Sequence, residues 1–211
     1  MAQPFWEKAY RDLATPAIRG GAPSQEIREI AAQLPPGARV LDLGCGEGRN
    51  ALFLAECGFQ VTAVDISATG IAKLNALARE RGLDIHSEVA DMRAYHFPER
   101  FDLIVSHGCL HLVEREFWQQ LISRFKAHTN PGGLNVVVVF TDTLPPPEDL
   151  REFCVGLFHE GEVFSLYSDW EVVRRQSYTI HDQHPGTAPH THPINKLVAR
   201  KPSDRPTRGE A

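Results

Sequence analysis

A short apolar strand that runs directly into a glycine-rich turn is the feature that most constrains this chain. Residues 40–48 read Val-Leu-Asp-Leu-Gly-Cys-Gly-Glu-Gly, and a helical pattern begins at Arg49. Glycines allow positive φ angles and a close approach of the backbone to a ligand. A strand, a turn of this kind and a helix together mark the edge of a doubly wound sheet where nucleotide-like ligands bind. The turn therefore predicts an α/β fold with a ligand site above it.

Helix and strand patterns alternate along most of the chain. We expect helices over residues 24–34, 49–57, 67–82 and 117–125, and strands over residues 40–43, 60–64, 85–89, 101–105 and 134–140. Short strands separated by helices of about ten to fifteen residues indicate βαβ units and a parallel sheet. Two last strands, 170–180 and 195–201, have no helix between them, which predicts a C-terminal antiparallel hairpin on a mostly parallel, doubly wound sheet.

The length and composition fit one globular domain. The chain has 211 residues, 42% apolar and 23% charged, which excludes a disordered or fibrous protein. One domain is the expectation at this length, since a domain takes about 150 residues. We expect it to span residues 1–200, with residues 1–35 forming an N-terminal helical cap. Residues 201–211 are polar and are expected to fray.

The charge and the cysteines limit the possible partners and compartments. The net charge is −5 and no run of Lys or Arg exceeds two residues, so we expect no nucleic-acid partner. The four cysteines show no zinc-site spacing, which favours reduced thiols in the cytoplasm. No signal-peptide core and no segment long enough to cross a bilayer is seen, so we expect no membrane partner. We therefore expect a small-molecule partner. We expect the protein to be a monomer or a homodimer.

The polar residues around the glycine turn discriminate among nucleotide-like ligands. A dinucleotide turn has the spacing G-x-G-x-x-G, whereas this one has G-x-G-x-G, with Asp42 two residues before the first glycine. A carboxylate at that position repels a pyrophosphate and suits a ligand with an ammonium group, such as the methionine part of S-adenosylmethionine (SAM). A Walker A loop is excluded, because no Gly-Lys-Ser/Thr follows. Asp65 ends the next strand, where a carboxylate can accept both ribose hydroxyls.

With these residues in view, the chain resembles the class I SAM-dependent methyltransferases. The resemblance is carried by DLGCGEG and by VTAVDIS at residues 61–67. It implies a Rossmann-like sheet of seven strands and SAM as the cofactor. By resemblance, the methionine moiety would lie against Asp42, Gly44, Cys45 and Gly46, the ribose against Asp65, and the adenine against Ile66, Asp91 and Met92.

A closer resemblance is to the tellurite-resistance methyltransferases. The supporting stretches are GRNALFLA at residues 48–55, FHEGEV at 158–163 and YSDWEVV at 167–173. This resemblance implies methyl transfer from SAM to a chalcogen oxyanion or a similar soft nucleophile. It also adds further residues to the expected cofactor site, namely Trp6, Tyr10, Arg49, Asn50 and Ser106.

The methyl acceptor is expected outside the end of the strand 101–105, because ligands of this fold bind at the carboxyl ends of the strands. His107 follows that strand and is the residue best placed to face the methyl group, so we predict it to be catalytic. His111 is expected to be a packing or a solvated residue without a catalytic role. No N-P-P-Y or D-P-P-F type sequence follows the strand, which argues against adenine-N6 and glutamine-amide acceptors.

The segment 181–193 contains four histidines and no arginine, whereas the resembling family carries arginines there. An arginine suits the binding of an oxyanion, and a histidine can remove a proton or bind a metal. Three interpretations stay open: His181 and His184 act as general base and positioning groups, the histidines bind a transition metal, or the segment is a solvated turn. A strand through His190 and His192 would place both rings on one side. His181 corresponds to a family position credited with proton transfer.

We therefore predict a SAM-dependent methyltransferase that acts on a small soft nucleophile of the tellurite, selenite or thiol type. One alternative is an O- or N-methyltransferase of a small metabolite. A different class of protein, a non-catalytic SAM- or metal-binding protein on the same scaffold, would keep the same glycine turn. Turnover separates these alternatives, and the turn alone does not.

Overall fold

A computed structural model describes residues 7, 10, 11, 21–146, 148, 150–182 and 189–203. Trp6 and His184, two of the expected site residues, lie outside these ranges. So do most of the expected N-terminal cap before residue 21 and the last eight residues of the expected tail.

The centre of the structure is a seven-stranded sheet in the order β3-β2-β1-β4-β5-β7-β6. The first five strands along the chain pair in parallel, and β7 pairs antiparallel with both β5 and β6. This confirms the predicted mostly parallel sheet with a C-terminal antiparallel hairpin. The strand bounds are β1 Arg39–Leu43, β2 Gln60–Asp65, β3 Ile85–Val89, β4 Phe101–His107, β5 Thr129–Phe140, β6 Glu171–Asp182 and β7 His190–Arg200.

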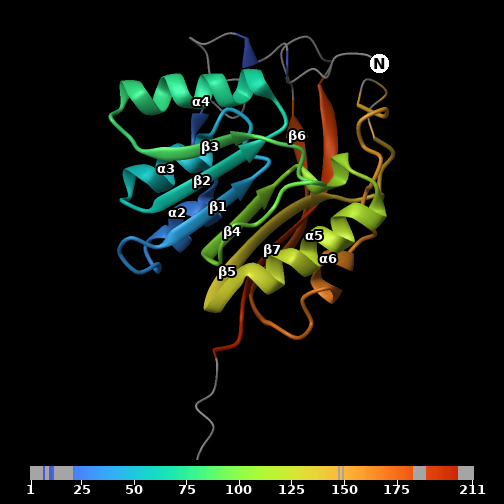
Figure 1. The fold of residues 1–211 in the computed structure, drawn as a ribbon. Helices are drawn as coiled ribbons and strands as arrows, with labels where there is room; N and C mark the ends of the chain where they lie inside the picture. Colours follow the sequence, from blue (N-terminus) through green and yellow to red (C-terminus); the bar gives the residue numbers. More distant parts are fainter. Residues whose placement is uncertain are drawn as a thin grey trace, which may run out of the picture.

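Helices cover both faces of the sheet (Figure 1). One face carries α2 (Gln25–Ala31), α3 (Arg49–Glu56) and α4 (Ala68–Glu80), and the other carries α5 (Arg115–His128) and the short α6 (Glu162–Ser165). A 3₁₀ turn, η2 (Leu110–Leu112), follows β4. Each helical layer closes a separate apolar core, because β-strand side chains alternate between the two faces. The predicted cap of α4 is confirmed, since the Ser67 hydroxyl accepts from the Gly70 N–H at 2.9 Å.

The C-terminal hairpin is longer than the sequence predicts. β7 begins at His190, five residues before the expected start, and β6 continues to Asp182. The two strands pair from Glu171 opposite Arg200 to Asp182 opposite His190, with one register shift between Val172 and Arg174. Proline and histidine are weak strand signals, but continuous pairing satisfies the backbone groups and outweighs local preference. Part of the segment expected to be a loop is therefore strand.

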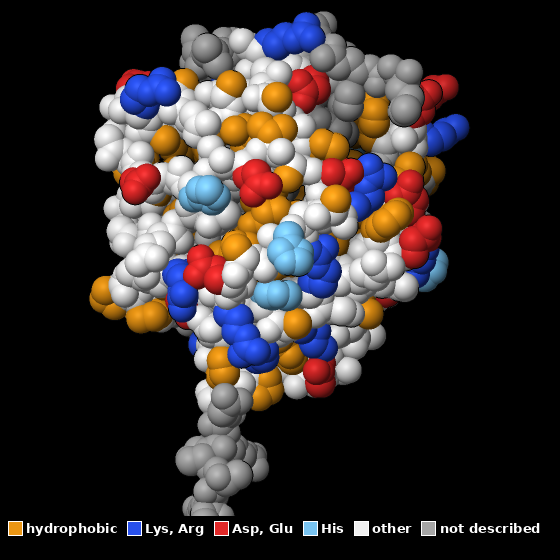
Figure 2. Space-filling view, in the orientation of Figure 1, with side chains coloured by type: hydrophobic (Ala, Val, Ile, Leu, Met, Phe, Trp, Pro, Cys, Tyr) orange, Lys and Arg blue, Asp and Glu red, His pale blue; other side chains and the backbone are white. Residues whose placement is uncertain are grey.

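Acidic and basic side chains are interspersed over the face shown in Figure 2. Among the described helices, none is long and apolar enough to cross a membrane. All four cysteines are free thiols, as the sequence predicts.

Candidate functional site: a cofactor cradle and an acceptor pocket

The glycine turn lies at the carboxyl end of β1, and its glycines are required by close neighbours. Gly44 and Gly46 have φ angles of +79° and +58°. A Cβ on Gly44 would lie 2.4 Å from the Cys109 Sγ, and one on Gly46 would lie 2.5 Å from the Tyr10 hydroxyl. Only glycine therefore lets the segment after β4 and the Tyr10 ring close on the turn. Tyr10 thus lies against the turn, and its contact with the cofactor stays a prediction.

Asp65 at the end of β2 holds the turn in shape. Its Oδ2 accepts from the Gly46 N–H at 2.7 Å, and its Oδ1 accepts from the Ser67 N–H at 2.8 Å. Burial raises the pKa of this carboxyl, and these backbone bonds oppose the rise. Glu47, inside the turn, forms a buried ion pair with Lys73 of α4 at 2.7 Å. The turn is thus fixed before any ligand arrives.

Asp42 is the least satisfied carboxylate of the site. Its side chain is buried, with 2% of the residue exposed, and its Oδ2 has no hydrogen-bond partner within the described residues. Burial raises the pKa of Asp42 to about 7, and the Arg49 charge limits the rise. A buried polar atom without a partner is costly and needs a donor. An ammonium group of a ligand would supply that donor, so the residues around the turn fit the methionine end of SAM.

The residues expected around adenine divide into two groups. Ile66 is 58% exposed at the end of β2, and the Met92 Cε lies 3.7 Å from the position of a Gly44 Cβ. Both are thus available to a ring that binds beside the turn. The Asp91 carboxylate is already bonded by the Arg93 guanidinium, with the Nε atom 2.9 Å from Oδ2. A ligand amine would have to compete with Arg93.

Three residues expected at the cofactor have other partners. The Ser106 hydroxyl is buried 3.1 Å from the Cys109 Sγ, so it supports the segment after β4. Arg49 donates to the Ser24 hydroxyl at 2.8 Å, and the Asn50 Oδ1 accepts from the Ser24 N–H at 2.9 Å. Arg49 and Asn50 therefore anchor the start of α2, and the Arg49 charge also acts on Asp42 of the cofactor site. The spacing of the glycine turn does not show whether residues that follow it contact the cofactor or support neighbouring elements.

His107 lies at the carboxyl end of β4, but both of its ring nitrogens are occupied. The Nδ1 lies 3.2 Å from the Arg49 guanidinium, and the Nε2 lies 3.0 Å from the Glu26 Oε1. A guanidinium can only donate, so Nδ1 accepts and the proton is assigned to Nε2, which donates to Glu26. Burial lowers the pKa of His107, consistent with a neutral ring. His107, predicted to be catalytic, thus lines the pocket with both nitrogens hydrogen-bonded, and its catalytic role stays a prediction.

Beside His107 lies a pocket of about 200 Å³. At its polar end the Lys196 Nζ lies 2.7 Å from the Glu26 Oε2, and both side chains are buried. Burial alone would raise the pKa of Glu26, but the hydrogen bonds from His107 and Lys196 outweigh it and lower the pKa to about 2. The remaining lining residues are Ser24, Gln25, Gly108, Val138, Phe140, Tyr178, Ile180 and Ile194.

Glu26 and Lys196 are not among the site residues predicted from the sequence, although each leaves a signal. Glu26 lies four residues before Ile30, on the buried face of the first expected helix. Lys196 is a charge within a buried strand, next to Leu197. Buried charges in apolar elements are usually paired. A charge at either position therefore indicates that a partner exists, but only the tertiary structure shows which residue the partner is.

His181 does not reach this pocket. Ile180 lines the pocket, and successive side chains of a strand point to opposite faces. His181 is exposed on the other face, where its Nδ1 lies 3.1 Å from the Thr191 Oγ1. His184 lies outside the described residues. The expected packing role of His111 agrees with the structure, in which its buried ring stacks on Phe140 with centroids 4.0 Å apart.

His190 and His192 do lie on one side of β7, with ring centroids 4.7 Å apart. The metal interpretation of this segment needs at least a third ligand for most transition-metal sites. Among the residues that the structure describes, no three His, Cys, Asp or Glu side chains are grouped to hold a metal ion.

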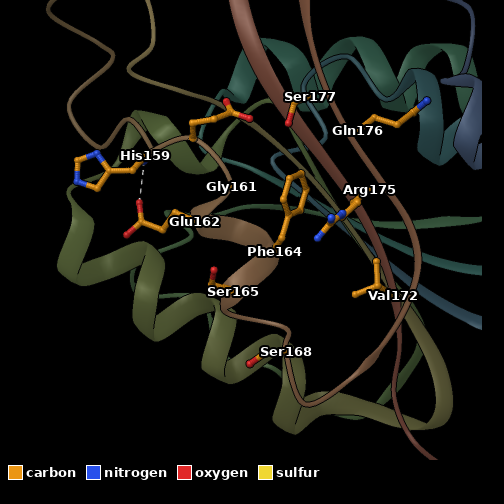
Figure 3. A pocket seen from close by; sticks show the side chains of 11 residues that line it. His159, Gly161, Glu162, Phe164, Ser165, Ser168, Val172, Arg175, Gln176 and Ser177 are labelled. Carbon is orange, nitrogen blue, oxygen red and sulfur yellow. Dashed lines mark hydrogen bonds between the residues drawn. The ribbon is translucent and has the colours of Figure 1, made fainter.

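A larger hollow of about 860 Å³ lies between α6 and β6, on the other side of the C-terminal hairpin (Figure 3). Phe164 and Arg175 face each other there, with the guanidinium carbon 6.0 Å from the ring centroid. None of the described residues expected at the cofactor or the acceptor lines it. Asn195 donates to Glu160 and Ser177 of its lining, whereas the next residue, Lys196, reaches the pocket beside His107.

Comparison with known proteins agrees with this geometry. A family model described as "Tellurite resistance protein TehB" matches residues 20–185. The chain is 37% identical over 169 residues to the probable S-adenosyl-L-methionine-dependent methyltransferase TehB of Haemophilus influenzae, with 79% of this chain and 54% of the relative covered. It is 34% identical over 157 residues to the 2-heptyl-1-hydroxyquinolin-4(1H)-one methyltransferase of Mycobacteroides abscessus, with 69% and 68% covered.

The crystal structure of TehB from Haemophilus influenzae superimposes with a TM-score of 0.75 at 30% identity, covering 84% of this chain and 62% of that one. This chain spans about half the length of the Haemophilus influenzae relatives that it matches. The fold is that of the class I SAM-dependent methyltransferases.

Proposed function

Because this chain belongs to the TehB tellurite-resistance family, we propose that it transfers a methyl group from SAM to a small soft nucleophile of the thiol, selenite or tellurite type. The observation that carries the proposal is the buried Asp42 oxygen beside the glycine turn. It has no partner among the described residues, and the ammonium group of SAM would supply one.

Residues around the turn complete the proposed cofactor site. Asp65 would hold the ribose, Ile66 and Met92 would cover the adenine, and Tyr10 would close the turn. When bound, SAM supplies a methyl group on a sulfonium leaving group that is already activated. The chain has to align the acceptor and exclude water. The occupied ring of His107 suits an acceptor that arrives ionised, because no free base stands at this position.

A second candidate is O- or N-methylation of a small metabolite. The apolar side of the pocket beside His107 favours it, since Phe140, Ile180 and Ile194 can contact an organic acceptor. The Mycobacteroides abscessus relative is named for such an acceptor, a hydroxyquinolone.

The test is S-adenosylhomocysteine release by the purified protein, with selenite, tellurite, a small thiol and a catechol in separate reactions, each with and without a chelator. Release with any of them, together with SAM binding in calorimetry, supports a methyltransferase. Tight SAM binding without release from any acceptor would favour a non-catalytic binding protein. Absence of SAM binding would refute the proposed function itself.

A further inference from the structure

We propose that the pocket beside His107 selects a small organic acid as methyl acceptor, a phenol- or thiol-type molecule with a flat apolar body, and not an inorganic oxyanion. Lys196 meets the ionised group, and the strand side chains of β5, β6 and β7 contact the body. This inference rests on the proposed methyl transfer from SAM. It narrows the acceptor to the thiols of the first candidate and the hydroxyl compounds of the second, and it excludes selenite and tellurite.

The shape and walls of the pocket favour an organic ring. Apolar and aromatic side chains from three strands form one side, namely Val138, Phe140, Tyr178, Ile180 and Ile194. An apolar cavity of about 150 Å³ is enough to admit benzene, so about 200 Å³ admits one substituted ring. An inorganic oxyanion has no apolar surface, so it could contact only the polar end of the pocket and would leave the apolar side unfilled.

The polar end of the pocket favours a single negative charge. The Lys196 ammonium has three N–H donors, and Glu26 accepts one of them at 2.7 Å. Within the described residues no second hydrogen-bond acceptor contacts this ammonium, so a donor is left for a ligand. Arg49 adds a second cation behind His107.

The segment after β4 connects this pocket to the cofactor turn. Gly108 lines the pocket, and the next residue, Cys109, lies against Gly44 of the turn. An acceptor in the pocket would therefore lie beside Gly108, and a cofactor on the turn would lie beside the next residue, Cys109. The lone pair of the acceptor sulfur or oxygen forms the new bond to the methyl carbon. The bond from that carbon to the sulfonium breaks with its electrons going to sulfur, and the acceptor proton has already left to water.

The experiment measures binding of 4-nitrophenol and thiophenol to the protein saturated with S-adenosylhomocysteine. Nitrobenzene is the uncharged analogue, and selenite and tellurite are the inorganic competitors. The double variant Glu26→Gln/Lys196→Met removes the ion pair as a unit, which avoids leaving one buried charge unpaired. Tyr178→Ala shortens the apolar wall at a half-exposed position. The exposed pair of Arg81 and Glu56, bonded at 2.8 Å, gives the matched control Glu56→Gln/Arg81→Met.

We expect wild type to prefer 4-nitrophenol over nitrobenzene by about tenfold or more, and the Glu26/Lys196 double variant to lose that preference, since hydrogen bonds to charged groups are stronger than those to neutral ones. Tyr178→Ala should weaken both aromatic probes severalfold, and the control should change neither. SAM affinity should stay within about twofold in every variant.

Failure of both aromatic acids to bind would overturn the proposal. So would wild-type binding by the double variant, or displacement of 4-nitrophenol by selenite or tellurite at equal concentration. If wild type binds no SAM, the proposed function fails first, and that outcome is distinguishable because SAM binding is measured separately.

Discussion

Two buried carboxylates, Glu26 beside His107 and Asp42 beside the glycine turn, have opposite acid–base properties. Glu26 is 1% exposed and Asp42 is 2% exposed. The pKa of Glu26 is lowered to about 2, because bonds from His107 and Lys196 outweigh its burial. The pKa of Asp42 is raised to about 7, because burial dominates and the described residues leave one oxygen without a partner.

The difference separates a structural charge from a charge kept for a ligand. Glu26 is neutralised by its own chain, so it fixes α2, β4 and β7 relative to one another. Asp42 is stabilised incompletely until a ligand arrives, so it costs stability in the free protein. Perturbed carboxyls of the second kind mark binding sites more reliably than buried charge alone.

The largest effect is expected from Glu26→Gln. It leaves Lys196 buried without its ion-pair partner, which costs about 3–5 kcal/mol of the free energy of unfolding. Urea denaturation measures this cost. Glu56→Gln, which breaks the exposed pair with Arg81, should cost no more than about 1 kcal/mol. Equal effects of the two variants would show that Glu26 is not a structural charge.

Asp42→Asn should weaken SAM binding strongly without lowering the stability of the free protein. We expect SAM affinity to fall about 100-fold, because a buried charged contact is lost. The free energy of unfolding of the free protein at neutral pH should stay the same or rise, because a poorly satisfied charge is removed. Calorimetry and urea denaturation on one preparation give both numbers. A stability loss as large as that of Glu26→Gln would remove the distinction between the two carboxylates.

The stability of the free protein and its affinity for SAM should both depend on pH through Asp42. A raised folded-state pKa means that free Asp42 keeps its proton up to about pH 7. Its contribution to stability is present below its ordinary pKa near 3.8 and is lost as pH rises through about 7. Binding an ammonium requires the ionised form, so SAM affinity should fall about tenfold for each pH unit below 7. Calorimetry from pH 5 to 8 tests this slope, and Asp42→Asn should flatten it.

A smaller effect is expected at the adenine side. Asp91 is bonded by Arg93, so Asp91→Asn alone should change SAM affinity by no more than about twofold. In an Arg93→Ala background the carboxylate is free for a ligand amine, and the same substitution should weaken binding about threefold. The double-mutant cycle measures the difference. Additive effects would mean that Asp91 does not contact the cofactor.

The smallest effect is expected from His181→Ala. Because His181 faces away from the pocket and bonds Thr191, we expect turnover to change less than about twofold. His111→Ala is not a suitable control, because removing a buried ring would itself lower stability. Thr191→Ala is the matched variant, because it removes only the partner of His181. A tenfold loss in His181→Ala alone would restore the role that the sequence resemblance implies.

The sequence by itself determined the fold and the cofactor half of the site. The order of strands and helices, the glycine turn, Asp42 and Asp65 are local patterns, because each depends on residues close together in the chain. The tertiary structure alone decided the acceptor half. Glu26, His107 and Lys196 meet from α2, β4 and β7, more than 80 residues apart in sequence. No local pattern records which buried charges pair, because the pairing depends on how distant elements pack. The same reason explains why Arg49 hydrogen-bonds Ser24, and why His181, the residue after the pocket-lining Ile180, lies on the outer face.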